Sequence, residues 1–177
     1  MGDSSWGTLA IAVVTGGTAV LASWVTSRGS TRAARIQAET TARAQRAERL
    51  RESRRAAYLD LIEQTHRMGE LFWEISAALQ LPDSATRTAS LDALVDREVA
   101  EYVRIRRCAR VVELEGPPSV AAAALSLQRA TRPFYVAVRA ELAGDTDGRA
   151  AFDASYRPFW ATLERFVVAA RTAHQSE

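Results

Sequence analysis

An unbroken run of uncharged residues near the N-terminus constrains this chain more than any other feature. Residues 4–27 hold 24 consecutive positions without a charge, flanked by Asp3 and Arg28. At about 1.5 Å per residue, a helix of about 20 residues spans roughly 30 Å, the thickness of a bilayer's hydrocarbon core. The run therefore predicts a transmembrane helix over residues 6–26, preceded by a short extracytoplasmic N-terminus over residues 1–5.

Two other interpretations of this run compete with the membrane span. A cleaved signal peptide calls for a basic region before the apolar core and a small-residue cleavage site. Residues 1–5 contain no basic side chain, and Ala22-Ser23-Trp24 fits such a site poorly. A buried core helix of a soluble domain is the other alternative. Trp6 and Trp24 favour the span, because indole rings prefer the headgroup level at both ends of a membrane helix.

Charge next to the span predicts its orientation. Arg28, Arg32 and Arg35 follow the span directly, whereas the other flank has no Lys or Arg. Basic residues are enriched on the cytoplasmic side of membrane helices. The N-terminus is thus expected outside the cell membrane and the C-terminus in the cytoplasm, with the three arginines at the membrane surface. The single cysteine, Cys108, agrees with a reducing compartment.

Small residues recur at a spacing of four within the predicted span. Thr8, Ala12 and Gly16 would share one helix face, and such faces let two membrane helices approach closely. They form the candidate transmembrane packing site and predict a homo-oligomer. The alternative is that small residues are simply frequent in a membrane helix of an alanine-rich chain.

A basic helical stalk is expected over residues 27–55. Between Arg28 and Ala57, nine arginines face three glutamates, a net charge of +6 (9 − 3). These arginines fix membrane topology or contact anionic lipid, since each basic residue near such a surface contributes about 1 kcal/mol. Nucleic acid is the weaker alternative as a partner. The segment has no aromatic side chain for base stacking and no known nucleic-acid-binding motif.

Residues 56–177 are expected to form a cytoplasmic helical bundle. Apolar residues recur at threes and fours, which is typical of amphipathic helices. The predicted helices cover residues 56–81, 91–114, 118–143 and 149–174, with a polar loop over 82–89 and Ser90 as an N-cap. The predicted inward side chains are Tyr58, Leu61, Ile62, Thr65, Met68, Phe72, Ile75, Leu79, Leu91, Leu94, Val95, Val99, Tyr102, Ile105 and Val112. The fold class is all-α: a transmembrane helix and a long basic juxtamembrane helix that continues into an antiparallel four-helix bundle.

Two prolines and one turn modify this pattern. Pro133 and Pro158 each lie within a helical segment and are followed by two aromatic residues. Each proline should kink its helix or mark a short break. Residues 144–148, Gly-Asp-Thr-Asp-Gly, are interpreted as a connector with Asp147 as a cap, because a calcium loop needs more acidic ligands.

The search for catalytic or metal-binding motifs yields little. Glu63-x-x-His66 matches half of a di-iron four-helix site, but no second Glu-x-x-His follows. Cys108 lies among arginines that could lower the pKa of a thiol, but no histidine is near it in sequence, and a small residue at a helix–helix contact is the simpler interpretation. No phosphate loop, nucleophile elbow or dinucleotide motif occurs. We therefore expect no enzyme, no cofactor and no metal.

The order of these features resembles a known group of proteins. Arg54-Arg55-Ala56-Ala57-Tyr58-Leu59-Asp60-Leu61-Ile62 and Val111-Val112-Glu113-Leu114-Glu115-Gly116-Pro117 are similar to segments of small single-pass membrane proteins of actinobacteria, some of them KilB-like plasmid-transfer proteins. The resemblance implies a membrane location and a helical cytoplasmic region, and it carries over no active residue.

The preferred functional hypothesis is a membrane-anchored interaction or scaffold protein. Its cytoplasmic bundle would be presented to an unknown protein partner or to a second copy. The alternatives are a DNA- or plasmid-transfer-associated membrane accessory protein and a membrane-bound helical-bundle enzyme or metalloprotein.

Overall fold

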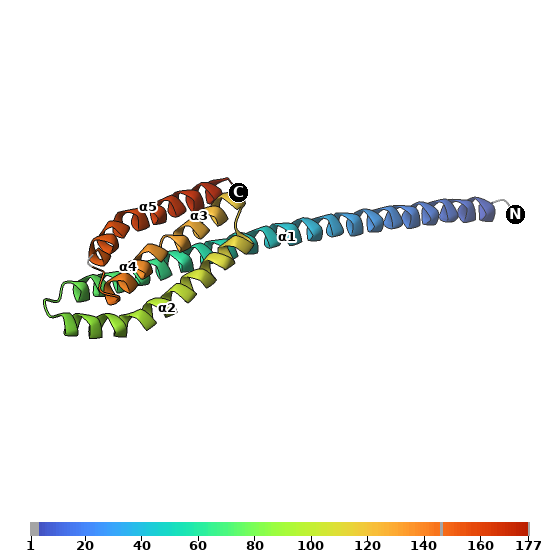
Figure 1. Ribbon diagram of the computed structural model, residues 1–177. Helices are drawn as coiled ribbons and strands as arrows, with labels where there is room; N and C mark the ends of the chain where they lie inside the picture. The colour runs from blue at the N-terminus through green and yellow to red at the C-terminus, as the bar shows by residue number, and fades with distance from the viewer. Residues whose placement is uncertain (1–3, 146, 177) are drawn as a thin grey trace. The chain divides into compact units, whose positions relative to one another are not determined.

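The chain folds entirely into helices in the part that the structure describes. This structure, a computed structural model, describes residues 4–145 and 147–176, with side chains from Ala34 onward. The chain divides into two units, residues 1–49 and residues 50–177. The helices, labelled in Figure 1, are α1 (Ser4–Leu79), α2 (Ser84–Glu115), α3 (Pro118–Arg129), α4 (Arg132–Leu142) and α5 (Gly148–Gln175). No strand occurs in these described residues, so the predicted all-α class is confirmed.

An aromatic cluster forms the centre of residues 50–177. Phe72 of α1 stacks on Phe134 of α4, with ring centroids 3.7 Å apart and planes 12° apart. It meets Phe152 and Phe159 of α5 edge-on, at centroid distances of 6.1 and 5.4 Å. All four rings are fully buried. Since aromatic side chains bury large areas and favour edge-to-face or offset contacts, this cluster joins three helices into one core.

The bundle part of α1 and helix α2 run in opposite directions. Glu74 of α1 pairs with Arg97 of α2, and Gln64 lies against Glu101. Nearer the N-terminus of α1, the Arg54 Nε donates a hydrogen bond to the carbonyl oxygen of Glu115 at the end of α2, at 2.7 Å. Lower numbers on α1 thus meet higher numbers on α2. The apolar faces of both helices meet below this polar edge, where Leu61, Ile75 and Ile105 are fully buried.

Helix α2 starts earlier than its sequence indicated. Residues 82–89 were expected to be a loop with Ser90 as the cap, but α2 begins at Ser84. Asp83 is the N-cap, and its carboxylate accepts hydrogen bonds from the backbone N–H and the hydroxyl of Thr86, at 2.7 and 2.6 Å. Arg87 in the next turn pairs with Glu141 of α4 at 3.1 Å. The Ser/Thr-rich composition suggested a loop over residues 82–89. The Asp83 cap and the Arg87–Glu141 ion pair instead stabilise the first turns of α2.

The two prolines act in different ways. The helix expected over 118–143 is interrupted at Ala130–Thr131, and Pro133 lies in the first turn of α4. Proline lacks an N–H and its ring collides with the carbonyl four residues earlier, so it disturbs a helix interior but fits the first turn. Pro158, in contrast, lies inside α5, which continues from Gly148 to Gln175.

The connector before α5 ends α4 in the expected way. The Gly144 N–H donates to the Glu141 carbonyl at 2.9 Å, and the Asp145 N–H donates to the Ala140 carbonyl at 3.0 Å. This pair of bonds is a Schellman motif, in which a left-handed residue follows the helix. Gly144 has φ of +86°, which a residue without Cβ adopts at little cost. Asp147 occupies the N-cap position of α5, but its side chain makes no capping hydrogen bond.

The predicted inward face of the bundle is largely correct. Tyr58, Leu61, Thr65, Met68, Phe72, Ile75, Leu79, Leu91, Ile105 and Val112 are buried. Ile62, Leu94, Val95 and Tyr102 are partly buried against the same core. Val99 was expected inside but is 45% exposed, because its neighbour Glu98 takes the buried position.

The predicted membrane span over residues 6–26 lies outside the residues whose side chains are described. In the part of the chain whose side chains are described, no helix combines the length and apolar character needed to cross a bilayer. The span, the extracytoplasmic residues 1–5 and the orientation remain predictions.

Candidate functional site

The membrane-surface and packing residues predicted from the sequence fall mostly outside the described side chains. Thr8, Ala12, Gly16, Arg28 and Arg32 all do so. Arg35 is described: it is exposed, and its Nε lies 3.2 Å from the Glu39 carboxylate one turn later. This exposed pair contributes only a few tenths of a kcal/mol to helix stability.

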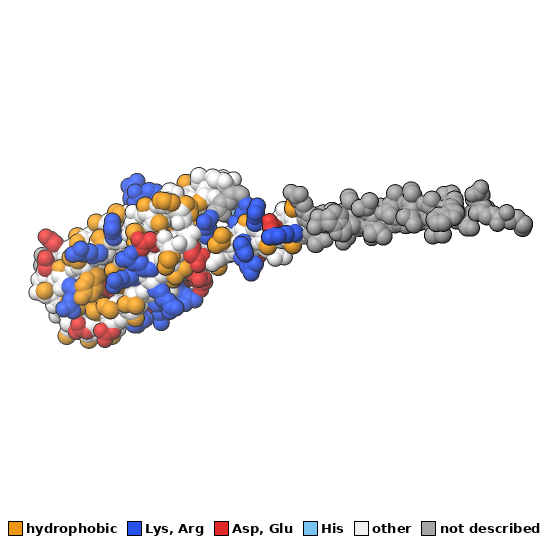
Figure 2. All heavy atoms as spheres, turned by 90° about the vertical axis from the view of Figure 1, so that its right-hand side faces the viewer, with side chains coloured by type: hydrophobic (Ala, Val, Ile, Leu, Met, Phe, Trp, Pro, Cys, Tyr) orange, Lys and Arg blue, Asp and Glu red, His pale blue; other side chains and the backbone are white. Residues whose placement is uncertain are grey.

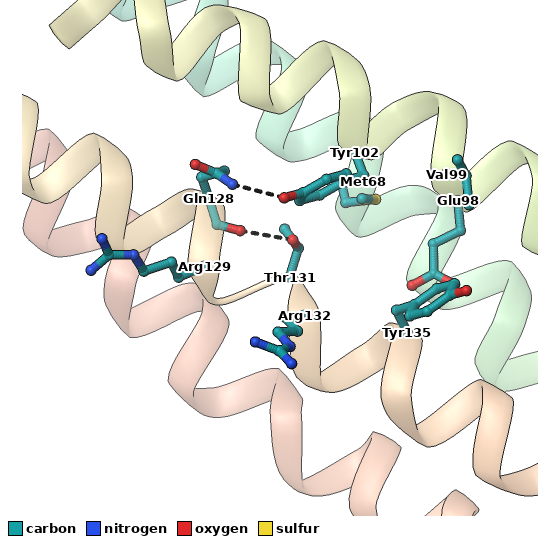
Figure 3. Close-up of a pocket in the computed structure, with 9 residues that line it drawn as sticks. All are labelled: Met68, Glu98, Val99, Tyr102, Gln128, Arg129, Thr131, Arg132 and Tyr135. Atoms are coloured by element: carbon teal, nitrogen blue, oxygen red, sulfur yellow. Dashed lines mark hydrogen bonds between the residues drawn. The ribbon is translucent and has the colours of Figure 1, made fainter.

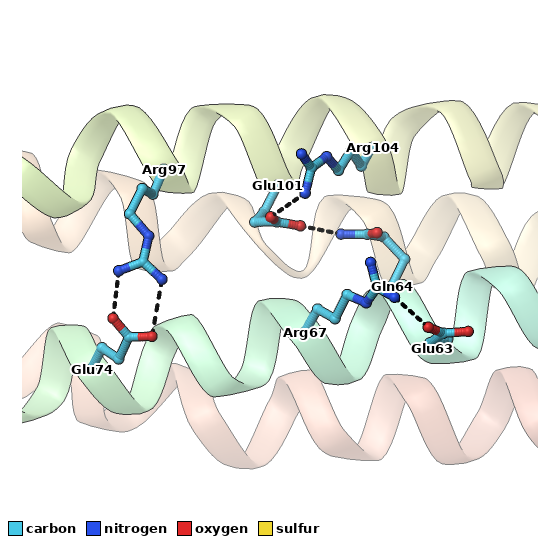
Figure 4. A network of polar contacts seen from close by, with 7 residues as sticks. All are labelled: Glu63, Gln64, Arg67, Glu74, Arg97, Glu101 and Arg104. Atoms are coloured by element: carbon cyan, nitrogen blue, oxygen red, sulfur yellow. Dashed lines mark hydrogen bonds and ion pairs between the residues drawn. The ribbon is translucent and has the colours of Figure 1, made fainter.

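Glu63 and His66, the residues of the possible metal motif, contact Arg67 and Trp160. Glu63 pairs with Arg67 on the same helix (Figure 4). His66 lies against the Trp160 ring of α5, with centroids 5.6 Å apart. Across residues 34–145 and 147–176, no three His, Cys, Asp or Glu side chains lie close enough together to hold a metal ion.

A polar network joins α1 to α2 along one edge of the bundle. Arg97 contacts both carboxylate oxygens of Glu74, at 2.5 and 3.0 Å, as Figure 4 shows. These hydrogen bonds hold the pKa of Glu74 below its ordinary value. Glu101 accepts from Arg104 at 2.6 Å and lies against the Gln64 amide. Charge-assisted bidentate contacts fix the register of the two helices.

Cys108 does not have the properties of a reactive thiol. It is partly buried against the core. Burial raises its pKa, and the negative charge of Asp60 adds to this effect against the opposing influence of Arg107. Arg107 thus lowers the pKa as the sequence suggested, but burial outweighs it, and the simpler interpretation as a packing residue agrees with the structure.

A pocket of about 460 Å³ opens beside the break between α3 and α4 (Figure 3). Its volume falls within the range of small-molecule sites, about 300–1,000 Å³. It is lined from α1, α2, the ends of α3 and α4, and the residues between them: Met68, Glu98, Val99, Tyr102, Gln128, Arg129, Thr131, Arg132 and Tyr135.

Hydrogen bonds position the wall of this pocket where α3 ends. The Gln128 amide donates to the Tyr102 hydroxyl at 2.9 Å, and the Thr131 hydroxyl donates to the Gln128 carbonyl at 2.8 Å. Thr131 is itself buried. The Gln128 carbonyl also accepts from the Thr131 N–H, at 3.4 Å, and the bond to Tyr102 holds Gln128 against α2.

Glu98 is the unusual group of the pocket. It is only 2% exposed, and neither carboxylate oxygen accepts a hydrogen bond from any residue that the structure describes. Burial raises the pKa of Glu98 to about 7. Figure 3 shows its side chain reaching from α2 toward Tyr135 of α4, while the guanidinium groups of Arg129 and Arg132 point away from it.

Sequence reasoning missed Glu98, although a signal was present. Leu91, Glu98, Ile105 and Val112 are spaced by seven, and all are buried. Residues at this spacing occupy one helix face. A charged residue is normally assigned to the outer face of a helix. Here the seven-residue spacing of the buried neighbours indicated the position of Glu98 better than its charge did.

Apolar side chains also remain on the outer surface of residues 50–177. Val103 and Leu114 of α2 are 58% and 86% exposed, and Val99 and Val111 share their side of the helix. The face shown in Figure 2 has arginine side chains lying among apolar ones. α2 therefore carries an outward apolar stripe, defined by these four residues.

Comparisons with protein-family models, with curated proteins and with solved structures gave no match.

Proposed function

We propose that this protein is a single-pass membrane protein with a non-enzymatic helical interaction module in the cytoplasm. Residues 6–26 lie in the bilayer, residues 1–5 outside, and residues 28–177 on the inner side. The observation that carries the proposal is the uncharged run over 4–27, followed at once by Arg28, Arg32 and Arg35.

The proposed architecture joins the anchor to the module through one helix. The basic stalk over residues 27–55 continues into the first helix of an antiparallel four-helix bundle, in which α3 and α4 together take the place of one helix. The bounds of α1, Ser4–Leu79, support this continuity. Anchoring confines the module to two dimensions, which raises its effective concentration toward anything on the same membrane without a new contact.

The proposed partner is a second copy of the chain. Small residues at Thr8, Ala12 and Gly16 favour close approach of two spans. Two copies held in this way would bring their bundles near each other. The outward apolar stripe of α2 supports such a contact, because covering apolar surface is favourable by about 25 cal/mol per Å².

Single-cysteine labelling tests membrane location and orientation. Cys108 is replaced by Ala, and Ser5→Cys or Ser176→Cys then supplies the only thiol. In intact cells a membrane-impermeant maleimide should label Ser5→Cys, whereas Ser176→Cys should react only after permeabilisation. Labelling of Ser176→Cys in intact cells would overturn the orientation, and recovery of the chain in the soluble fraction would overturn the anchor.

Co-purification of two differently tagged copies tests the partner. Gly16→Ile should lower the recovered second copy, because a bulky side chain separates the spans, and Ala10→Ile on another face is the matched control. Leu114→Glu should also lower the recovered second copy, because it places a charge on the outward apolar stripe of α2. If wild-type copies do not co-purify, or if neither variant differs from the control, the chain is not its own partner.

A further inference from the structure

The pocket beside the α3–α4 break contains a carboxylate that the protein itself leaves unsatisfied. Hydrogen bonds to buried carboxylates are ordinarily made, because burying a charge without a partner is strongly unfavourable. Neither carboxylate oxygen of Glu98 has a hydrogen-bond partner among the described residues. The fold therefore bears an uncompensated desolvation penalty at Glu98, and a bound donor would offset it.

The surroundings of Glu98 indicate what kind of donor would fit. Met68 and Val99 supply apolar contact, and Tyr102 and Tyr135 supply aromatic rings. A cation near a tyrosine ring is attracted by the ring's electron-rich face. A metal ion is disfavoured, because Glu98 is the only carboxylate among the lining residues and they include no His or Cys.

The positive groups of the pocket do not already neutralise Glu98. Arg129 and Arg132 are exposed, and Figure 3 shows them directed away from the carboxylate. Neither donates a hydrogen bond to it. Solvent screens exposed guanidinium groups, so they do not prevent a ligand cation from reaching the buried end of the pocket.

From this geometry we propose that the pocket binds an apolar organic amine, whose ammonium group pairs with Glu98 and whose aromatic or aliphatic body lies between Met68, Val99 and the two tyrosines. The volume of about 460 Å³ suits a ligand of one or two rings. This binding function does not depend on the membrane anchor.

Binding of this kind depends on pH through Glu98. The other charged or titratable groups that line the pocket are Tyr102 of α2, Arg129 of α3, and Arg132 and Tyr135 of α4, while α1 contributes only Met68. Because burial raises the pKa of Glu98 to about 7, the carboxylate is mostly protonated at about pH 6 and mostly ionised at about pH 8. An amine that remains cationic across this range should bind about tenfold more weakly at the lower pH.

Matched ligands and matched variants test the proposal. The full chain in phosphatidylcholine nanodiscs is titrated by calorimetry with benzylamine and 1-naphthylmethylamine, and with the neutral 1-naphthylmethanol. Wild type should prefer the naphthyl amine to the alcohol by about 10–100-fold, the range given by hydrogen bonds to charged groups. Glu98→Gln should abolish this preference, whereas Glu113→Gln, an exposed carboxylate on the same helix, should preserve it.

A second variant separates pocket binding from adsorption to lipid. Val99 lines the pocket but is half-exposed, so Val99→Phe should narrow the pocket without unfolding the core. It should therefore weaken binding of the amine. Three results would each overturn the proposal: no saturable binding of either amine up to about 1 mM, equal affinity for amine and alcohol, or an undiminished preference in Glu98→Gln. Empty nanodiscs provide the baseline for lipid uptake.

Discussion

Glu98 shows how one residue alters both the stability and the chemistry of this bundle. It occupies a position of the α2 seam that Leu91, Ile105 and Val112 fill with apolar side chains. Its burial raises the pKa from 4.5 to about 7. The native state therefore keeps a proton that the unfolded chain releases, and the free energy of unfolding falls as the pH rises from 4.5 to 7, then levels off.

Replacing Glu98 with Gln should remove this pH dependence. At about 1.4 kcal/mol per pKa unit, the protonation difference amounts to on the order of 3 kcal/mol above pH 7. Glu98→Gln should therefore be more stable than wild type at pH 8 by about 1–3 kcal/mol, and nearly equal to it at pH 5. Urea unfolding of the detergent-solubilised full chain, followed by near-UV circular dichroism, measures the difference. The same gain at both pH values would contradict the burial argument.

Phe72 lies at the centre of the aromatic core. It is fully buried and contacts three other phenylalanine rings. Phe72→Ala should lower the free energy of unfolding by about 3–5 kcal/mol, because it leaves a cavity among rings that cannot collapse around it. Leu114→Ala, at an 86% exposed site, should change stability by less than about 0.5 kcal/mol. Equal effects of the two variants in chemical denaturation would refute the assignment of the core.

At the scale of the helices, periodicity predicted most of what is observed. The apolar repeats placed the inward face of α1 correctly and that of α2 correctly except for Val99, and the proline rule anticipated a disturbance at Pro133. The start of α2 was missed because Asp83 and Arg87 act through local capping and a distant ion pair. The pocket was not predictable, since it arises where four separate helices meet and not from a local pattern.

The contact between α1 and α5 depends on a residue without a side chain. A Cβ added to Gly69 would lie 2.7 Å from two ring carbons of Trp160. Gly69→Ala should therefore destabilise the fold by about 1–3 kcal/mol, despite the higher helix propensity of alanine.

A double-mutant cycle separates these two effects. In a Trp160→Leu background the obstruction is absent, and Gly69→Ala should stabilise by about 0.5–1 kcal/mol. Equilibrium unfolding of all four chains gives the coupling energy. If Gly69→Ala has the same effect in both backgrounds, the close approach of Trp160 does not control this contact.

For the whole molecule, the distribution of charge is the organising feature. Arginine alone supplies the 23 basic charges, since the chain has no lysine, yet the net charge is only +2. The segment from Arg28 to Ala57 alone carries a net charge of +6. The rest of the chain is therefore net acidic, with a charge of −4 (2 − 6). Such asymmetry directly after an uncharged run is expected of a membrane protein held by its basic flank.

Alkaline extraction of membranes from cells that express the full chain tests the anchor most directly. Wild type should remain in the membrane pellet, whereas Val14→Arg should shift toward the soluble fraction, because a central arginine costs about 2.5–3.5 kcal/mol on insertion scales. Val103→Arg, an equivalent change on the exposed surface of α2, should stay in the pellet like wild type. Release of the wild-type chain by alkaline carbonate, or identical partition of wild type and Val14→Arg, would contradict a bilayer-spanning segment.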